Sequence, residues 1–273
     1  MTKYRSSQLT QKRKKQFQLK FILIVVILIS FVFVLSALSK SDFLSIDKIE
    51  IKGNDVVKEE DLRKIINKNL EGNYFRLFSK SNILIYPKQA IKVESERLFP
   101  RIKEFDFSLD LPRSLNVNIA ERKPYVSWCD KDCFFVDKEG YIFEKISILP
   151  ETFFTYYTDL RELTPSSDFV PRKPSSPIRQ FILNSENFKE VDSFVKFVDG
   201  LGLEPYKFMA EGEKYSIYLG TQKTQIIFDK NQNIKEVMNN LQSILNMDEF
   251  TDIENFKKLE YIDLRFGNKV FYK

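Results

Sequence analysis

Histidine is absent from this chain, and cysteine, glycine and tryptophan are scarce: its 273 residues include two cysteines, eight glycines and one tryptophan. Without histidine, a Ser-His or Cys-His nucleophile pair and a His-ligated metal site are excluded. Two cysteines are too few for a structural zinc site when no other soft ligand is present. The glycines form no P-loop, GxGxxG or GxSxG motif. We therefore expect a protein that holds no cofactor or metal and is not an enzyme.

One class of enzyme needs neither histidine nor a glycine motif. Two SxxK tetrads, Ser45–Lys48 and Ser193–Lys196, match the first motif of the penicillin-binding enzymes. The SDN and KTG motifs that accompany it are absent, and a chain this rich in serine and lysine contains such tetrads by chance. The 38 acidic residues also offer carboxylate pairs for glycan cleavage, but nothing in the sequence singles out two of them. An anchored cell-wall enzyme stays open as a less favoured alternative.

Acidic residues are also absent from the beginning of the chain, where the first one is Asp42. Residues 1–20 carry seven basic residues, whereas the chain after Lys40 has 35 basic and 38 acidic residues. Between these parts, residues 21–38 form an uncharged run of 18 residues, FILIVVILISFVFVLSAL. A helix of this length spans roughly 27 Å, close to the hydrocarbon thickness of a bilayer. The sequence predicts a transmembrane helix over 21–38, in contact with membrane lipid.

The uneven charge predicts the orientation of this helix. A basic flank stays in the cytoplasm, so residues 1–20 are expected to form a cytoplasmic tail, with the C-terminus outside the cell membrane. Two alternatives stay open. A signal peptidase could cleave at Ala37-Leu38-Ser39, although the apolar run exceeds the usual length of about 7–15 residues. The run Lys12-Arg13-Lys14-Lys15 could bind nucleic acid, but we interpret it as a topology signal and expect no nucleic-acid partner.

The two cysteines, Cys129 and Cys133, lie close together in the segment WCDKDCFF. Aromatic residues flank the three-residue Asp-Lys-Asp loop, a pattern that predicts a hairpin. Cysteines that face each other across a hairpin are close enough to form a disulfide. An extracytoplasmic location favours this bond, and a free, half-buried pair is the alternative.

The first folded region is expected over residues 44–121. Residues 46–51 alternate as a strand, and residues 58–70 place their apolar side chains on one helical face. A second helix is predicted to run from Pro87 to about Leu98. Alternating apolar residues then predict two strands, over 105–111 and 115–119. Two helices can cover one face of a three-stranded sheet, so we predict an α+β fold.

The second region, over residues 122–273, is predicted to be a mixed β-rich domain with two helices. After the cysteine hairpin and a strand at 141–145, five prolines among residues 150–180 predict a long loop. Apolar periodicity then predicts helices over 188–198 and 234–245. Strands are expected near 203–210, 213–219 and 222–228, and then at 258–266 and 269–273 around the turn Gly267-Asn268.

The last predicted strand, Asn268–Lys273, has nothing after it in the sequence to cover it. The edge strand of a sheet carries unpaired backbone N–H and C=O groups, to which a strand of another protein can be added. The alternative is that Lys269 and Lys273 protect this edge against pairing.

Motifs along nearly the whole chain resemble the FtsQ/DivIB family of bitopic bacterial cell-division proteins. The first region is similar to the POTRA domain of that family, and the second is similar to its β domain. Any one of these motifs is common, but their order and spacing behind a single N-terminal span are more specific. The motifs are Ile49-Glu-Ile-Lys-Gly-Asn54, Gly72-Asn-Tyr-Phe75, Leu98-Phe-Pro-Arg-Ile102, Leu111-Pro112, Leu115, Glu121-Arg-Lys-Pro124, Trp128, Phe135-Val-Asp137, Gly140, Phe143, Leu219-Gly220 and Tyr261-Ile-Asp-Leu-Arg-Phe266.

The resemblance implies a non-enzymatic scaffold of the division septum, with bitopic partners of the FtsB/DivIC and FtsL type. It also implies contacts of the POTRA domain with other division proteins and a C-terminal edge that takes up a partner strand. The chain departs from the family after Leu149-Pro150, where a long Phe/Tyr- and Pro-rich segment replaces a glycine, and the cysteine pair is not a family feature. By position, the implied partner edge comprises Tyr261, Ile262, Leu264, Arg265, Phe266, Asn268, Lys269, Val270, Phe271 and Tyr272. Another membrane-anchored POTRA protein of envelope assembly is the alternative.

Overall fold

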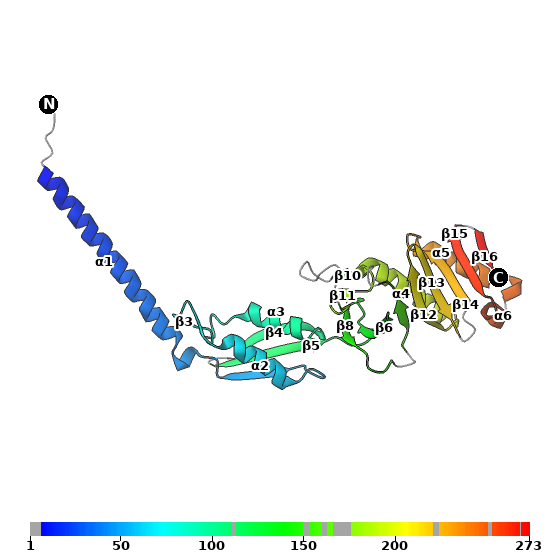
Figure 1. The fold of residues 1–273 in the computed structure, drawn as a ribbon, viewed down its shortest axis with the longest axis horizontal. Helices are drawn as coiled ribbons and strands as arrows, with labels where there is room; N and C mark the ends of the chain where they lie inside the picture. Colours follow the sequence, from blue (N-terminus) through cyan, green and yellow to red (C-terminus); the bar gives the residue numbers. More distant parts are fainter. Residues whose placement is uncertain are drawn as a thin grey trace, which may run out of the picture. The chain divides into compact units, whose positions relative to one another are not determined.

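The computed structural model describes residues 7–110, 113–149, 153–159, 163–165, 176–220, 224–250, 253–267 and 269–273, with side chains from residue 13 onward. The chain divides into two compact units, Met1–Glu121 and Arg122–Lys273, which we describe separately. Figure 1 labels most of their helices and strands.

The first unit begins with the long helix α1, Ser7–Ser39. Within it, Arg13–Ser39 is the one helix of the described chain that is long and apolar enough to cross a membrane. Nearly all its apolar side chains are exposed, which suits contact with lipid better than packing in a protein core. A one-turn 3₁₀ helix, Asp42–Leu44, follows directly.

The rest of the first unit has the predicted order of strand, helix, helix, strand, strand. Its sheet has the order β1-β5-β4, in which β5 pairs parallel with β1 and antiparallel with β4. The elements are β1 Lys48–Lys52, α2 Glu59–Leu70, α3 Lys88–Leu98, β4 Ile102–Asp110 and β5 Ser114–Glu121.

Both helices of this unit contribute to one apolar core. Leu62 and Ile66 of α2 and Ile91 of α3 are fully buried, in one cluster with Leu115 and Val117 of β5. Burial of each such side chain contributes about 1.5–3 kcal/mol. The two helices therefore hold the three-stranded sheet together, as the apolar periodicity predicts.

A short hairpin between the two helices is absent from the sequence-based prediction. It pairs β2, Asn73–Tyr74, with β3, Phe78–Ser79. Two-residue strands carry too little alternation to be read from a sequence. This hairpin lies against the end of α1 (Figure 1).

The second unit is built on a nine-stranded sheet with the order β16-β15-β14-β13-β12-β9-β6-β7-β8. A separate pair consists of β10, Thr164–Pro165, and β11, Gln180–Phe181. The nine strands are β6 Val126–Cys129, β7 Cys133–Val136, β8 Ile142–Lys145, β9 Thr155–Tyr157, β12 Pro205–Glu211, β13 Lys214–Leu219, β14 Thr224–Asp229, β15 Tyr261–Phe266 and β16 Lys269–Tyr272.

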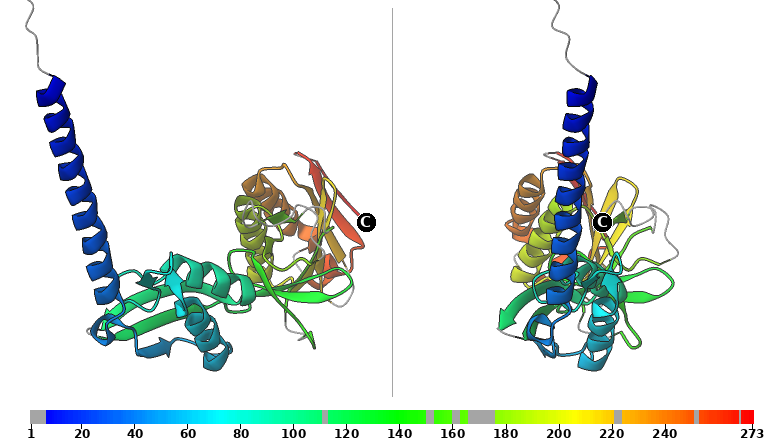
Figure 2. Two further views of the ribbon diagram at one scale, coloured as in Figure 1. Left: turned by 60° about the vertical axis from the view of Figure 1, so that its left-hand side comes forward. Right: turned by 90° about the vertical axis from the view of Figure 1, so that its left-hand side faces the viewer.

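Two amphipathic helices, α4 Ser185–Gly200 and α5 Ile234–Leu245, lie side by side on this sheet (Figure 2). Each begins at an asparagine whose side chain accepts a hydrogen bond from a backbone N–H of the first turn: Asn184 in α4 and Asn233 in α5. The short helix α6, Ile253–Lys257, precedes β15 and is not among the predicted helices. The α+β fold class is confirmed.

The structure corrects the prediction of a loop over residues 150–180. Within that range, β9 is an inner strand that runs parallel to both β6 and β12. Its Tyr156 is fully buried and packs against Phe188 and Phe208, with ring centroids 5.7 and 5.1 Å away. The prolines that predicted a loop flank this Thr-Tyr-Tyr segment, whose residues favour strands. Much of the remaining range lies outside the described residues.

Cys129 and Cys133 are joined in a disulfide that closes the β6–β7 hairpin, with their Cα atoms 4.2 Å apart. They are directly opposite residues in the antiparallel ladder. The neighbouring pair, Trp128 and Phe134, is buried in the core of the second unit. The disulfide thus lies at the end of a hairpin whose neighbouring residues are already packed in the hydrophobic core.

Candidate partner-binding edge

The C-terminal strand β16 forms one edge of the nine-stranded sheet (Figure 1). It reaches this position because β15 joins β14 in parallel, after the connection through α5 and α6, and the chain then turns back. The turn contains Gly267, whose φ of +61° suits glycine. Asn268, the other predicted turn residue, lies outside the described residues.

The structure corrects the predicted partner edge at β15. This strand is hydrogen-bonded on both sides, to β14 and to β16, so it offers no open edge. Ile262 and Leu264 are fully buried in the core, and Asp263 is only 6% exposed. A motif that resembles a family edge does not show which of two adjacent strands is the outer one. Of the predicted residues, those of β15 therefore support the edge, and those of β16 form it.

The backbone of β16 points alternately toward β15 and away from it. Lys273 and Tyr261 exchange two hydrogen bonds, from Lys273 N–H to Tyr261 O (3.2 Å) and from Tyr261 N–H to Lys273 O (3.4 Å). In an antiparallel ladder, such pairs recur at every second residue. The N–H and C=O groups of Phe271 therefore face β15, and those of Val270 and Tyr272 point outward, where another strand can pair with them.

The side chains of β16 differ between its two faces. Val270 is half-buried and packs against the core. Phe271 is 50% exposed and meets Phe266 of β15, which is 54% exposed, edge to face at 5.1 Å. The guanidinium of Arg265 lies 5.6 Å from the centre of the Phe266 ring. The edge thus combines outward backbone groups with an exposed aromatic pair.

Four residues from the preceding segments hold this hairpin in place. The Gln232 side chain donates to Leu264 O (2.9 Å), and the Asn240 side chain donates to Gly267 O (2.7 Å). The remaining contacts hold Tyr272: its ring packs against that of Phe250 at 5.3 Å, and its hydroxyl donates to Glu249 at 3.2 Å. This last hydrogen bond raises the pKa of Tyr272. Sequence reasoning missed all four residues, because their role depends on a fold that brings residues 232–250 beside the hairpin.

One charged pair, Asp263 and Arg265, lies on β15. Asp263 accepts hydrogen bonds from Arg265 Nε at 2.9 Å and from Arg265 Nη2 at 2.6 Å. Burial alone would raise the pKa of Asp263, but hydrogen bonds from the side chain and backbone of Arg265 outweigh it and lower that pKa. The carboxylate is therefore ionised near neutral pH. It accepts these hydrogen bonds at the point where the register between β15 and β16 shifts.

Lysines lie at both ends of β16. Lys269 and Lys273 are both exposed, and Lys273 forms an ion pair with Glu260 at 3.0 Å. This pairing raises the pKa of Lys273. Only Lys269 is thus left as a cation that discourages unspecific pairing, among the described residues of this hairpin.

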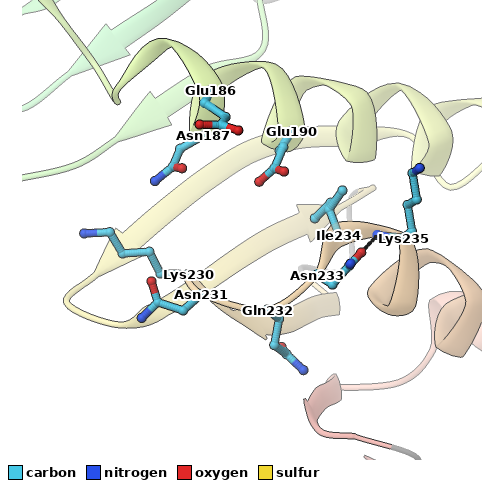
Figure 3. Close-up of a pocket in the computed structure, with 9 residues that line it drawn as sticks. All are labelled: Glu186, Asn187, Glu190, Lys230, Asn231, Gln232, Asn233, Ile234 and Lys235. Carbon is cyan, nitrogen blue, oxygen red and sulfur yellow. Dashed lines mark hydrogen bonds between the residues drawn. The ribbon is translucent and has the colours of Figure 1, made fainter.

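A shallow polar hollow lies between the start of α4 and the loop that leads into α5 (Figure 3). Glu186 and Glu190 of α4 face Lys230 and Asn231 across it. The described residues bring together no group of three potential metal ligands, here or elsewhere. The hollow lacks a nucleophile beside a base, so it supports no catalytic interpretation. Its lining residues are Glu186, Asn187, Glu190, Lys230, Asn231, Gln232, Asn233, Ile234 and Lys235.

The described chain thus combines an apolar N-terminal helix, a small α+β domain and a β-rich domain with an outer C-terminal strand. Residues 44–122 match the model of the POTRA domain, FtsQ-type. The chain is 28% identical over 135 residues to the cell division protein DivIB of Clostridium botulinum strain Loch Maree. It is 27% identical over 135 residues to DivIB of the Hall strain.

Each of these alignments covers 49% of this chain, and the chain spans about half the length of each relative, 48%. By this domain match and these two relatives, the chain is similar to the FtsQ/DivIB cell-division proteins.

Proposed function

We propose that this protein is a non-enzymatic scaffold of the bacterial division septum. In this proposal it recruits and regulates septal division proteins through contacts outside the cell membrane. The main support is the outer strand β16, because its Val270 and Tyr272 point their backbone groups away from the sheet. A bitopic partner of the FtsB/DivIC or FtsL type adds a strand there, and the Phe266–Phe271 pair contacts its side chains.

The proposal extends to location and domain roles. The helix α1 anchors the chain, residues 1–20 stay in the cytoplasm, and both folded units face outward. The POTRA domain over 44–121 contributes further contacts with division proteins, and the β domain over 122–273 carries the edge. The names of the two relatives, both cell division proteins, support a role at the septum. A band of a fluorescent fusion at mid-cell is expected, and diffuse membrane fluorescence would count against the septal role.

The strand addition is tested by removing one outward N–H. Val270→Pro removes a donor that points away from β15, so the internal ladder stays intact, and the proline ring obstructs an incoming strand. Val270→Ala is the matched control, because it trims the side chain and keeps the N–H. Binding of the partner's extracytoplasmic segment, measured by titration calorimetry, should fall at least about tenfold for the proline variant and clearly less for alanine.

Equal effects of the two substitutions would show that β16 does not pair through its backbone. Thermal unfolding of both variants checks that the β domain stays folded. The two alternatives have their own tests. Muropeptide release from peptidoglycan by the purified protein would favour a cell-wall enzyme, and normal septation in a strain that lacks the protein would favour another envelope-assembly role.

A further inference from the structure

The end of α1 is fastened by three hydrogen bonds, two to the β2–β3 hairpin and one to Asn82, which follows the hairpin. Ser36 Oγ donates to Leu77 O at 2.6 Å, and the backbone N–H of Ser79 donates to Ser39 Oγ at 3.0 Å. The side chain of Asn82 donates to Ser39 O at 3.0 Å. Ser36, Ser39 and Asn82 are each less than 10% exposed, at 5%, 7% and 3%. The hairpin is therefore attached to the helix itself and not to a linker after it.

This attachment fixes the level of the hairpin along the helix. Ser36 lies two residues before Leu38, the last residue of the uncharged run. Since a helix rises about 1.5 Å per residue, the carbonyl of Leu77 lies roughly 3 Å from the level of Leu38 along the axis, on the side of the apolar run. When α1 spans a bilayer, the hairpin tip reaches the boundary between acyl chains and headgroups.

The tip of the β2–β3 hairpin carries an exposed phenylalanine, Phe75, in a turn conformation that is unusual for this residue. Leu77 N–H donates to Tyr74 O at 2.9 Å, which closes a tight turn around Phe75 and Arg76. Both central residues have positive φ, +49° and +63°, a conformation in which asparagine and glycine are usual. The Phe75 side chain is 92% exposed, more than that of any other large apolar residue described. A strained backbone thus directs a phenylalanine outward.

The charge around the tip suits a lipid surface. Residues 72–93 contain no Asp or Glu, although the POTRA domain is otherwise rich in both. Arg76 lies beside Phe75 at the turn, and the Lys80 ammonium lies 5.9 Å from the Tyr74 ring. A phenylalanine flanked by cations, without acids, is the composition of segments that bind the membrane interface.

We infer that the tip of the β2–β3 hairpin is a membrane-interface anchor. Phe75 inserts at the boundary between the headgroups and the acyl chains of the outer leaflet, and Arg76 binds lipid phosphates beside α1. The inference rests on the membrane insertion of α1 that is part of the proposed function, and it is independent of β16 and of any division partner. The bilayer is the occupant, because the hairpin is attached to the helix that spans that bilayer.

The test places one new tryptophan at a time in the full chain, reconstituted in lipid nanodiscs. Phe75→Trp reports on the tip, and Phe31→Trp reports on the middle of the uncharged run over 21–38. Val56→Trp is the control, since Val56 is an exposed apolar residue, 59% exposed, beyond the other end of β1. The native Trp128 is buried and provides the background emission, which is measured in the unsubstituted chain and subtracted.

Lipids brominated near the headgroups or near the chain ends then quench tryptophan according to depth. We expect Phe75→Trp to lose most of its added emission to the shallow bromines, Phe31→Trp to be quenched by the deep ones, and Val56→Trp to keep its emission. Quenching of Phe31→Trp with no more quenching at residue 75 than at residue 56 would overturn the anchor while sparing the span. Absence of quenching at residue 31 would overturn both the anchor and the membrane insertion in the proposed function.

Discussion

Single side chains decide how firmly the C-terminal hairpin is held. Asp263 is buried on a strand whose ladder is irregular, between the pairs Asp263–Phe271 and Phe266–Lys269. The same carboxylate also accepts the backbone N–H of Arg265 at 3.1 Å. It therefore replaces part of the hydrogen bonding that the bulge removes from the ladder.

The lowered pKa of Asp263 makes this support sensitive to acid. A carboxyl whose pKa is lower in the folded protein stabilises the fold fully above its unfolded value, about 3.9, and loses that contribution as the pH falls through its folded pKa. We expect Asp263→Asn to lower the melting temperature at pH 7 and to reduce the further loss below about pH 4.

Thermal unfolding of both proteins at several pH values measures this difference. Glu211→Gln is a suitable control, because Glu211 is an exposed carboxylate that forms an ion pair with Lys214 on the next strand, at 3.5 Å. Parallel acid curves for Asp263→Asn and the unsubstituted chain would show that Asp263 contributes nothing to acid sensitivity.

At the scale of elements, the inner strand β9 is the least expected part of the β domain. It is three residues long and pairs with β6 and β12, which are more than 70 residues apart in the sequence. Tyr156 packs in its centre, and its buried hydroxyl has no hydrogen-bond partner among the described residues. Burial raises the pKa of this hydroxyl. The ring therefore stabilises the domain, and the hydroxyl does not.

Two substitutions separate these contributions. Tyr156→Phe should be neutral or should stabilise the domain by up to about 1 kcal/mol, because it removes an unpaired buried polar group. Tyr156→Ala should destabilise it by about 3–5 kcal/mol, because it leaves a cavity between three strands. Urea unfolding followed by Trp128 fluorescence reports on this domain. Small effects for both substitutions would mean that β9 is not an inner strand.

The helices and strands that can be located from the sequence are those long enough to show a regular spacing of apolar residues. The helix over 234–245 and the strand over 115–119 have apolar residues at regular spacing, and both are present at those positions. The three-residue β9 and the two-residue β2 and β3 have no period to detect. The sequence predicts a partner edge that includes both C-terminal strands, but the division into a buried β15 and an outer β16 depends on long-range pairing. The hydrogen bonds from the Gln232 and Asn240 side chains to this hairpin depend on the same long-range contacts.

At the scale of the whole molecule, the first helix separates two chemically different parts. Its uncharged run follows a tail with no acidic residue and precedes two folded units with a slight excess of acid. Ser39 lies in the helix and is hydrogen-bonded to Ser79 and Asn82, so the segment that a signal peptidase would need in an extended form belongs to the fold. This favours a retained anchor over a cleaved signal.

Protease protection checks this topology. In cells with an intact membrane, external protease should degrade both folded units and leave a tag on the N-terminus protected until the membrane is permeabilised. The tagged chain should also stay in the membrane fraction after an alkaline wash, at 32.4 kDa plus the mass of the tag. Release of a tag-free soluble form that begins after Ser39 would contradict the retained anchor.

The direct attachment of α1 to the β2–β3 hairpin has a mechanical consequence. A flexible linker would let the helix turn about its axis without moving the domain beyond it. Here Ser36 and Ser39 fix that rotation with hydrogen bonds. In the proposed topology, a neighbouring helix that twists α1 inside the bilayer therefore applies a torque to the POTRA domain, and this transmits a change on the cytoplasmic side to the other side of the membrane without any loop or ligand as intermediary.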